Sequence, residues 1–139
     1  MVTNGILATE ETILELEKSG LDAIQFSLDG LSMAHDKLRN KTGVYSSVMQ
    51  AIRFVINDTQ LHLSIAFTPT NFNVDDFEIV YENLARMWKE SNRAKGRDYI
   101  ELRLQPLMLL GRAKDNLDIV PSDNQYRKLV QLIREREVY

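Results

Sequence analysis

The residues of this chain that could bind a ligand stand at or after the ends of short apolar runs. Ser27 lies near the end of the run from Ala23 to Leu28, and Arg39 follows in a polar connector. A serine hydroxyl can both donate and accept a hydrogen bond, and the planar guanidinium of arginine pairs with both oxygens of a carboxylate. Each also has a structural interpretation. Ser27 could bond the loop that follows it, and Arg39 could be a solvated charge paired with Asp36.

Further candidates stand at or directly after the ends of the apolar runs. Because the carboxyl ends of the strands in a βα fold gather on one side, these residues are candidates to line a common cleft. They are Thr3, Asn4, Asp29, Asn71, Leu104 and Gln105. The first four also suit turns, and the last two would need only their backbone to contact a ligand. Arg112, in a Gly-Arg-Ala loop, is interpreted as a structural link between that loop and the fold.

The composition narrows the classes of function. The chain has 139 residues, a length typical of one domain, and its hydrophobic share of 44% allows a buried core. A net charge of -3 without a basic run leaves no electrostatic footprint for nucleic acid. No apolar segment is long enough to span a bilayer and no secretory signal opens the chain. We therefore expect a cytoplasmic protein with no nucleic-acid or membrane partner.

Cysteine is absent from the chain. This absence excludes a disulfide framework, a zinc–thiolate site, a cysteine nucleophile and an iron–sulfur site built by this chain alone. The histidines are interpreted structurally, His35 as a local hydrogen-bonding residue and His62 as a residue of a sheet face. Trp88 lies on a helical apolar stripe and is expected in the core. We therefore predict no metal ligand and no catalytic residue in this chain.

Apolar runs alternate with helical periods along the whole chain. This alternation predicts βαβ units, so the predicted fold is α/β, one domain over residues 1–139, with parallel βα repeats that form part of a TIM-type barrel. The predicted strands are Met1–Thr3, Ala23–Leu28, Leu61–Phe67 and Tyr99–Leu104. The predicted helices are Thr9–Ser19, Val44–Ile56, Val74–Asn92 and Ser122–Glu135.

Two connectors and three helix starts complete the predicted layout. The connector 32–42 is expected to be irregular, with one helical turn, and the connector 106–118 is expected to be a loop. Thr9 and Asn73 are predicted N-caps of the helices that follow them. Ser122 and Gln125 have the spacing of a capping box.

Five segments stand in an order that covers nearly the whole chain: VTNG, IQFSLDG, AHDKLRNKTGVYSSVMQAI, SIAFTPTNFN and QPLMLLGRA. This order resembles that of the radical S-adenosylmethionine (radical SAM) superfamily. It looks most like the branch with molybdenum-cofactor, PQQ and haem-type biosynthesis proteins and peptide-maturing, SPASM-like enzymes. In that family the His-Asp-x-x-Arg run usually ends in Arg-Gly, whereas Arg39 is followed here by Asn40.

The resemblance implies a cleft for S-adenosylmethionine at the strand ends. Ser27 and Arg39 match the family positions that contact the ribose and the carboxylate of this cofactor. The other cofactor-binding candidates are Thr3, Asp29, Asn71, Leu104 and Gln105. In such enzymes a reduced 4Fe-4S cluster donates an electron to S-adenosylmethionine, and the resulting 5′-deoxyadenosyl radical takes a hydrogen atom from the substrate.

The resemblance also implies parts that this chain lacks. The family binds its cluster through a Cys-x₃-Cys-x₂-Cys motif after the first strand, and a Gly-Gly-Glu-type turn after the second strand contacts the cofactor's amino group. We therefore expect an internal fragment of a radical SAM oxidoreductase or biosynthetic enzyme, inert by itself and with no cofactor bound. The substrate of the parent, a small molecule or a peptide, stays open.

Two other hypotheses compete with this one. An unrelated aldolase-like barrel would require a lysine at a strand end as the Schiff-base former, and no interior strand position is lysine. Alternatively, the chain is an inactive barrel fragment or pseudoenzyme that acts as an interaction module. Exposed sheet edges pair readily with other chains, so such a fragment would self-associate.

Overall fold

The computed structural model describes residues 1–95, 99–108, 114–115 and 117–136. Arg112 and its Gly-Arg-Ala loop lie outside these residues. The described part of the chain contains no helix that is both long and apolar enough to cross a membrane.

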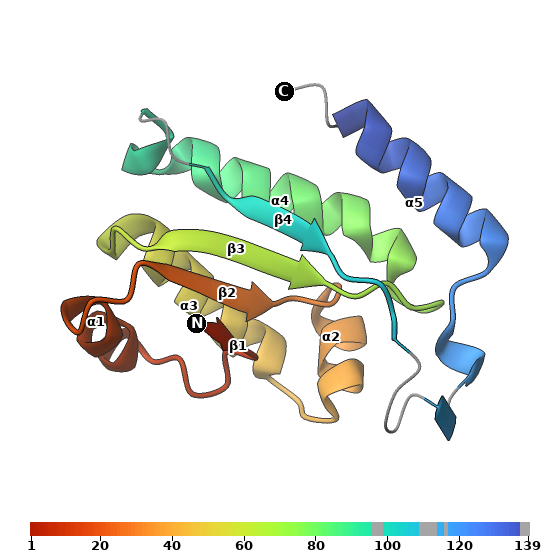
Figure 1. Ribbon diagram of the computed structural model, residues 1–139, viewed down its shortest axis with the longest axis horizontal. Helices are drawn as coiled ribbons and strands as arrows, with labels where there is room; N and C mark the ends of the chain where they lie inside the picture. The colour runs from red at the N-terminus through yellow and green to blue at the C-terminus, as the bar shows by residue number, and fades with distance from the viewer. Residues whose placement is uncertain (96–98, 109–113, 116, 137–139) are drawn as a thin grey trace.

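In the described part of the chain, four parallel strands form a central sheet in the spatial order β1-β2-β3-β4. They are β1 (Val2–Thr3), β2 (Ala23–Ser27), β3 (His62–Phe67) and β4 (Glu101–Leu104). Figure 1 shows all of them pointing the same way, with helices leading back between them. The predicted α/β class is therefore confirmed, and the single run of neighbouring parallel strands is compatible with part of a βα barrel.

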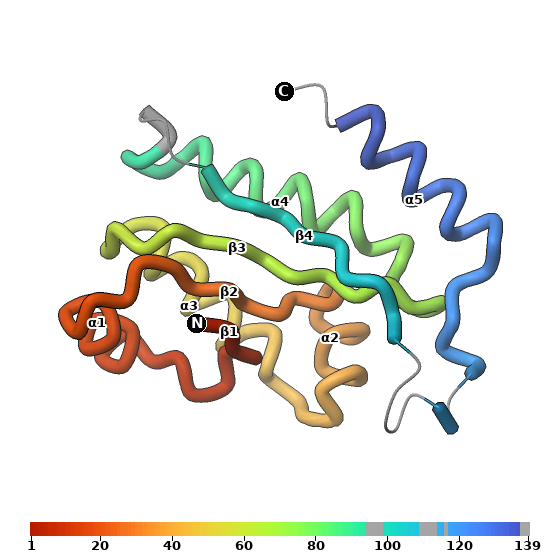
Figure 2. Tube along the Cα trace, viewed as in Figure 1, coloured from red at the N-terminus to blue at the C-terminus, as the bar shows by residue number. Residues whose placement is uncertain are grey.

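The helices fill the connections between the strands. They are α1 (Glu10–Lys18), α2 (Ser32–Arg39), α3 (Val44–Asp58), α4 (Phe77–Glu90) and α5 (Asp123–Arg136), with 3₁₀ turns η1 (Val74–Asp76), η2 (Asn92–Lys95) and η4 (Leu117–Ile119). Figure 2 shows α1 on the β1 side of the molecule and α5 on the β4 side. The connector 32–42 was predicted to be mostly irregular, and this was wrong because α2 occupies eight of its residues.

The sheet has one apolar face and one polar face because successive side chains of a strand point to opposite sides. Phe26, Ile65 and Phe67 are fully buried in the core, to which α3 and α4 contribute their apolar stripes. Both helices lie behind the sheet in Figure 1. The residues between these positions form mostly polar rows across the other face. One row joins Gln25, Ser64 and Glu101, and the next joins Ser27, Ala66 and Arg103.

Local hydrogen bonds fix the helix starts. The Thr9 hydroxyl accepts a 3.2 Å bond from the backbone N–H of Thr12, as predicted for an N-cap. The Ser122 N–H donates to the Gln125 side chain at 2.9 Å, and the Gln125 N–H donates to the Ser122 hydroxyl at 3.3 Å, which confirms the capping box. The prediction that Asn73 caps a helix was wrong, because its side chain bonds the strand ends instead.

Candidate functional site

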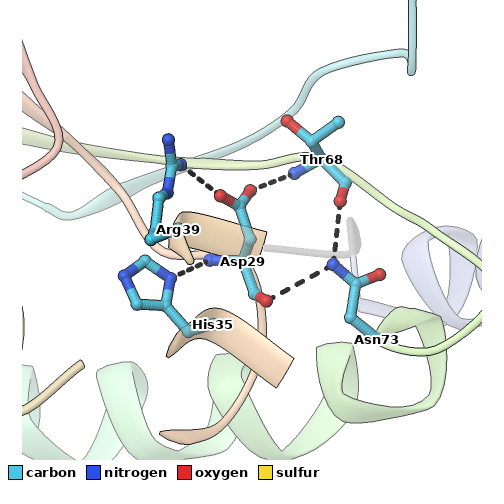
Figure 3. A network of polar contacts seen from close by, with 5 residues as sticks. All are labelled: Asp29, His35, Arg39, Thr68 and Asn73. Carbon is cyan, nitrogen blue, oxygen red and sulfur yellow. Dashed lines mark hydrogen bonds and ion pairs between the residues drawn. The ribbon is translucent and has the colours of Figure 1, made fainter. Parts of the chain in front are cut away.

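Polar residues join the carboxyl ends of β2 and β3 in a network that we call the strand-end clip. Its members are Asp29, His35, Arg39, Thr68 and Asn73, which Figure 3 shows together. Asp29 follows β2, Thr68 follows β3, and His35 and Arg39 lie on α2. The clip therefore brings the TPTN segment to the SLDG and HDKLR segments, which lie far from it in the sequence.

The Asp29 carboxylate is the centre of the strand-end clip. One oxygen accepts a 2.8 Å hydrogen bond from the backbone N–H of Thr68, and the other forms an ion pair with the Arg39 guanidinium. The Asp29 side chain is 4% exposed and that of Arg39 is 28% exposed. The pair thus has a buried anion and a cation that reaches the surface.

The alternative pairing of Arg39 with Asp36 was wrong. Asp36 instead accepts hydrogen bonds from the backbone N–H groups of Gly43 at 2.7 Å and Tyr45 at 2.8 Å. These groups lie at the start of α3, where the helix has N–H groups without partners inside the helix. The bond from Tyr45 is the main cause that lowers the pKa of Asp36. Asp36 therefore serves as a helix cap and leaves Arg39 to Asp29.

His35 supports the clip from within α2. Its Nδ1 atom accepts a 3.0 Å hydrogen bond from the backbone N–H of Asp29, so the neutral ring carries its proton on Nε2. The side chain is fully buried, and this burial is the main cause that lowers the pKa of His35, although the nearby Asp29 carboxylate acts in the opposite direction. The prediction of a local hydrogen-bonding role for His35 is confirmed.

Asn73 ties the loops after the two strands to each other. Its amide nitrogen donates to the carbonyl oxygens of Asp29 at 3.3 Å and Thr68 at 2.9 Å, and its amide oxygen accepts from the Thr70 N–H at 2.6 Å. Asn73 is fully buried. A second link comes from Asp76, whose carboxylate accepts a 2.9 Å bond from the Leu31 N–H.

Gly30 lets the chain turn between these groups. It has a φ of +105°, and a Cβ atom there would lie 2.8 Å from the Asp76 carboxylate. A side chain at this position would therefore meet both backbone strain and a steric clash.

The other predicted cofactor-binding residues lie around the same end of the sheet, with different surroundings. Ser27 ends β2 on the polar face and is half-buried. Thr3 uses its hydroxyl to accept a 3.1 Å bond from the Gly5 N–H, and Asn4 accepts one of 3.2 Å from the Ile6 N–H. Thr3 and Asn4 thus take part in the turn after β1. Ser27 stands two residues before Asp29 of the strand-end clip.

Asn71 and the two residues at the end of β4, Leu104 and Gln105, contact other elements of the fold. The Asn71 amide donates to the Asp118 carbonyl, and the Asn71 carbonyl accepts a 2.8 Å bond from the Gln125 side chain. The Gln105 N–H donates to Phe67 at 2.9 Å, which continues the ladder, and its side chain is exposed. Leu104 lines a groove with residues of α4 and α5, so its side chain lies on the helical side of the sheet.

Three buried side-chain atoms in the described part of the chain have no hydrogen-bond partner: His35 Nε2, Arg39 Nε and Thr70 Oγ1. All three belong to the strand-end clip or to the loop that it holds. Sequence reasoning missed Thr68 and Asn73 as members of the clip. The available signal was their polar character in the loop after an apolar strand, which a simple turn explains equally well.

Comparison with known proteins gives one informative similarity. No protein-family model matches the chain. The chain is 28% identical over 83 residues to the sporulation killing factor maturation protein SkfB of Bacillus subtilis (strain 168). The aligned region covers 60% of this chain and 20% of SkfB, so the chain spans far less than the length of that relative.

Proposed function

We propose that this chain is part of a radical SAM enzyme and that it forms a wall of the S-adenosylmethionine cleft. The observation that carries the proposal is the strand-end clip, because it joins three of the five segments of the resemblance at the carboxyl ends of neighbouring parallel strands. Ligands of βα folds bind at this end of the sheet. The weak similarity to SkfB supports a relation to radical SAM enzymes in general.

The residues at this end fit the polar groups of S-adenosylmethionine. Arg39 is partly exposed and contacts Asp29 through one terminal nitrogen. A guanidinium has several N–H donors, so it can hold Asp29 and a second carboxylate at once. The Ser27 hydroxyl, half-buried at the end of β2, can bond a ribose hydroxyl.

The iron–sulfur cluster does not fit this chain. Its 139 residues include no cysteine, and thiolates are the usual ligands of such a cluster. The described residues contain no group of three or more histidine, aspartate or glutamate side chains that could hold a metal ion. On this proposal the cluster belongs to another part of the same enzyme.

The proposed work of this chain is therefore to bind and orient. S-adenosylmethionine, when bound beside a reduced cluster, supplies the radical chemistry of the family. Arg39 holds the carboxylate, Ser27 holds the ribose, and the helices behind the sheet keep water from its apolar side. The polar face, with Gln25 and Ser64 joined by a 3.3 Å hydrogen bond, is turned toward the interior of the barrel.

The full-length gene product, purified without oxygen, tests the proposal. We expect it to contain iron and sulfide and to cleave S-adenosylmethionine to 5′-deoxyadenosine under reducing conditions. Changing Ser27→Ala together with Arg39→Ala should abolish the cleavage and leave the iron content unchanged. The matched control is Arg86→Ala, since Arg86 is an exposed arginine on α4. A full-length protein without iron or cleavage would refute the radical SAM proposal.

A second candidate, an interaction module, rests on the edges of the sheet. β1 and β4 each pair with one neighbouring strand, and an open strand edge can accept another chain. A mass measurement in solution would separate the two candidates for this segment. A stable dimer, with no binding of S-adenosylmethionine by the full-length protein, would favour the interaction module.

A further inference from the structure

The Asp29 carboxylate holds a cation and, at the same time, the backbone after a second strand. Its side chain is 4% exposed, and its two oxygens contact different partners. The Asp29 N–H is itself held by His35 at 3.0 Å, and the Asp29 carbonyl is held by Asn73 at 3.3 Å. Hydrogen bonds thus hold both the backbone N–H and the backbone C=O of the residue whose carboxylate pairs with Arg39.

This arrangement restricts the guanidinium of Arg39. A free arginine side chain samples many rotamers, and a ligand that binds it must order them. Arg39 lies at the last residue of α2 and contacts the buried carboxylate, so one end of its guanidinium is already anchored. The side chain still has 28% exposure, although its Nε atom is buried and has no partner in the described part of the chain. The exposed part of the guanidinium is therefore what another anion can reach.

We propose that Asp29 is a positioning residue, which orients the Arg39 guanidinium toward the carboxylate of the bound ligand. This inference rests on the proposed function, in which that ligand is S-adenosylmethionine. Asp29 does not touch the ligand itself. It acts by holding Arg39 in one orientation and by fixing Arg39 relative to the backbone of Thr68 after β3.

Two other roles of Asp29 make different predictions. If Asp29 only screens the positive charge of Arg39, removing its charge should strengthen the binding of a carboxylate ligand. If Asp29 only links β2 to β3 through Thr68, its loss should weaken all ligands of the site equally. Positioning predicts a selective loss for the ligand that carries a carboxylate.

The test compares S-adenosylmethionine with decarboxylated S-adenosylmethionine, which lacks the carboxylate. Titration calorimetry on the full-length protein without oxygen gives both dissociation constants, and their ratio is the readout. We expect Arg39→Gln to remove the preference for the carboxylate form. Asp29→Asn keeps an oxygen for Thr68 and loses the charge, and should lower the preference about fivefold, the scale of ordering one long side chain. The double variant should match Arg39→Gln alone.

Two further variants separate positioning from the other roles. Asp29→Glu keeps the charge but displaces the carboxylate, so positioning predicts a reduced preference and screening predicts no change. Asp76→Asn is the matched control, since Asp76 also bonds a backbone N–H near Gly30. It should leave the preference as in the wild type. Because the readout is a ratio within one variant, partial destabilisation of the fold affects both ligands alike.

Each remaining outcome has a defined meaning. A preference that rises in Asp29→Asn, or that stays at the wild-type value in both Asp29 variants, would overturn the positioning role. A wild-type protein that binds both ligands equally would overturn it too, because Arg39 would then not contact the carboxylate. A wild-type protein that binds neither ligand would refute the proposed function itself and the inference with it.

Discussion

Asn73→Ala should strongly destabilise the protein because the Asn73 side chain makes three hydrogen bonds, two to members of the strand-end clip and one to Thr70. The substitution removes a bond of 2.6 Å, one of 2.9 Å and one of 3.3 Å, and Asn73 is fully buried. At about 1 kcal/mol of net stability for each bond, the loss is about 3 kcal/mol. The buried N–H of Thr70 is also left without its partner, so this value is a lower bound on the loss of stability.

Urea unfolding followed by circular dichroism measures this loss as a lower midpoint at an unchanged slope. Asn73→Asp provides a second test, since it keeps the oxygen that accepts from Thr70 and replaces the donating nitrogen with a charged oxygen. That oxygen would face the carbonyls of Asp29 and Thr68, so the destabilisation should equal or exceed that of the alanine variant. Asn83→Ala on the exposed side of α4 is the control. A loss below about 1 kcal/mol for Asn73→Ala would refute this account of the clip.

The remaining predictions concern the histidine and the helix ends. Burial lowers the folded-state pKa of His35 below its ordinary value of 6.5, so the unfolded chain takes up the proton first. Stability should therefore fall as the pH drops below about 6.5, and urea unfolding at several pH values should show a weaker pH dependence in His35→Asn than in the wild type. Arg93 donates to three backbone carbonyls at and after the end of α3. Arg93→Ala should therefore lower the unfolding free energy by about 2 kcal/mol. The control is Arg127→Ala, at an exposed arginine, which should leave the unfolding free energy unchanged. Ser122→Ala removes a capping-box oxygen and should cost about 1 kcal/mol in the same assay. A wild-type urea midpoint in Arg93→Ala or Ser122→Ala, or a wild-type pH dependence in His35→Asn, would contradict the corresponding contact.

Several parts of the fold follow from local sequence patterns. The apolar runs that became β2 and β3 alternate with helical stripes, and these two periods are set by the geometry of the backbone itself. Thr9 and Ser122 cap their helices because each bonds an N–H only three residues away. The parallel order follows from the helices between the strands, because a crossover of that length brings the chain back to the start of the next strand.

The connector after β2 shows where local patterns were insufficient. α2 has few apolar residues, and its buried positions are Ala34 and His35. Its helical state depends on His35 bonding the Asp29 N–H and on Asp36 capping the next helix. Both are contacts between separate elements, so no periodicity within residues 32–42 could have indicated them.

The sequence by itself determined the fold class, the order of the elements and the set of polar residues that follow the strands. Only the tertiary structure decided which of these residues meet. The Asp29 side chain pairs with Arg39 instead of bonding the backbone of its own turn. The Asn73 side chain bonds the loops after two strands instead of capping the helix that follows it. The physical reason is that a buried polar group must find a partner in space. In a parallel sheet that partner comes from the neighbouring strand end, which lies about forty residues away in the chain, as with Asp29 and Thr68 at a separation of 39.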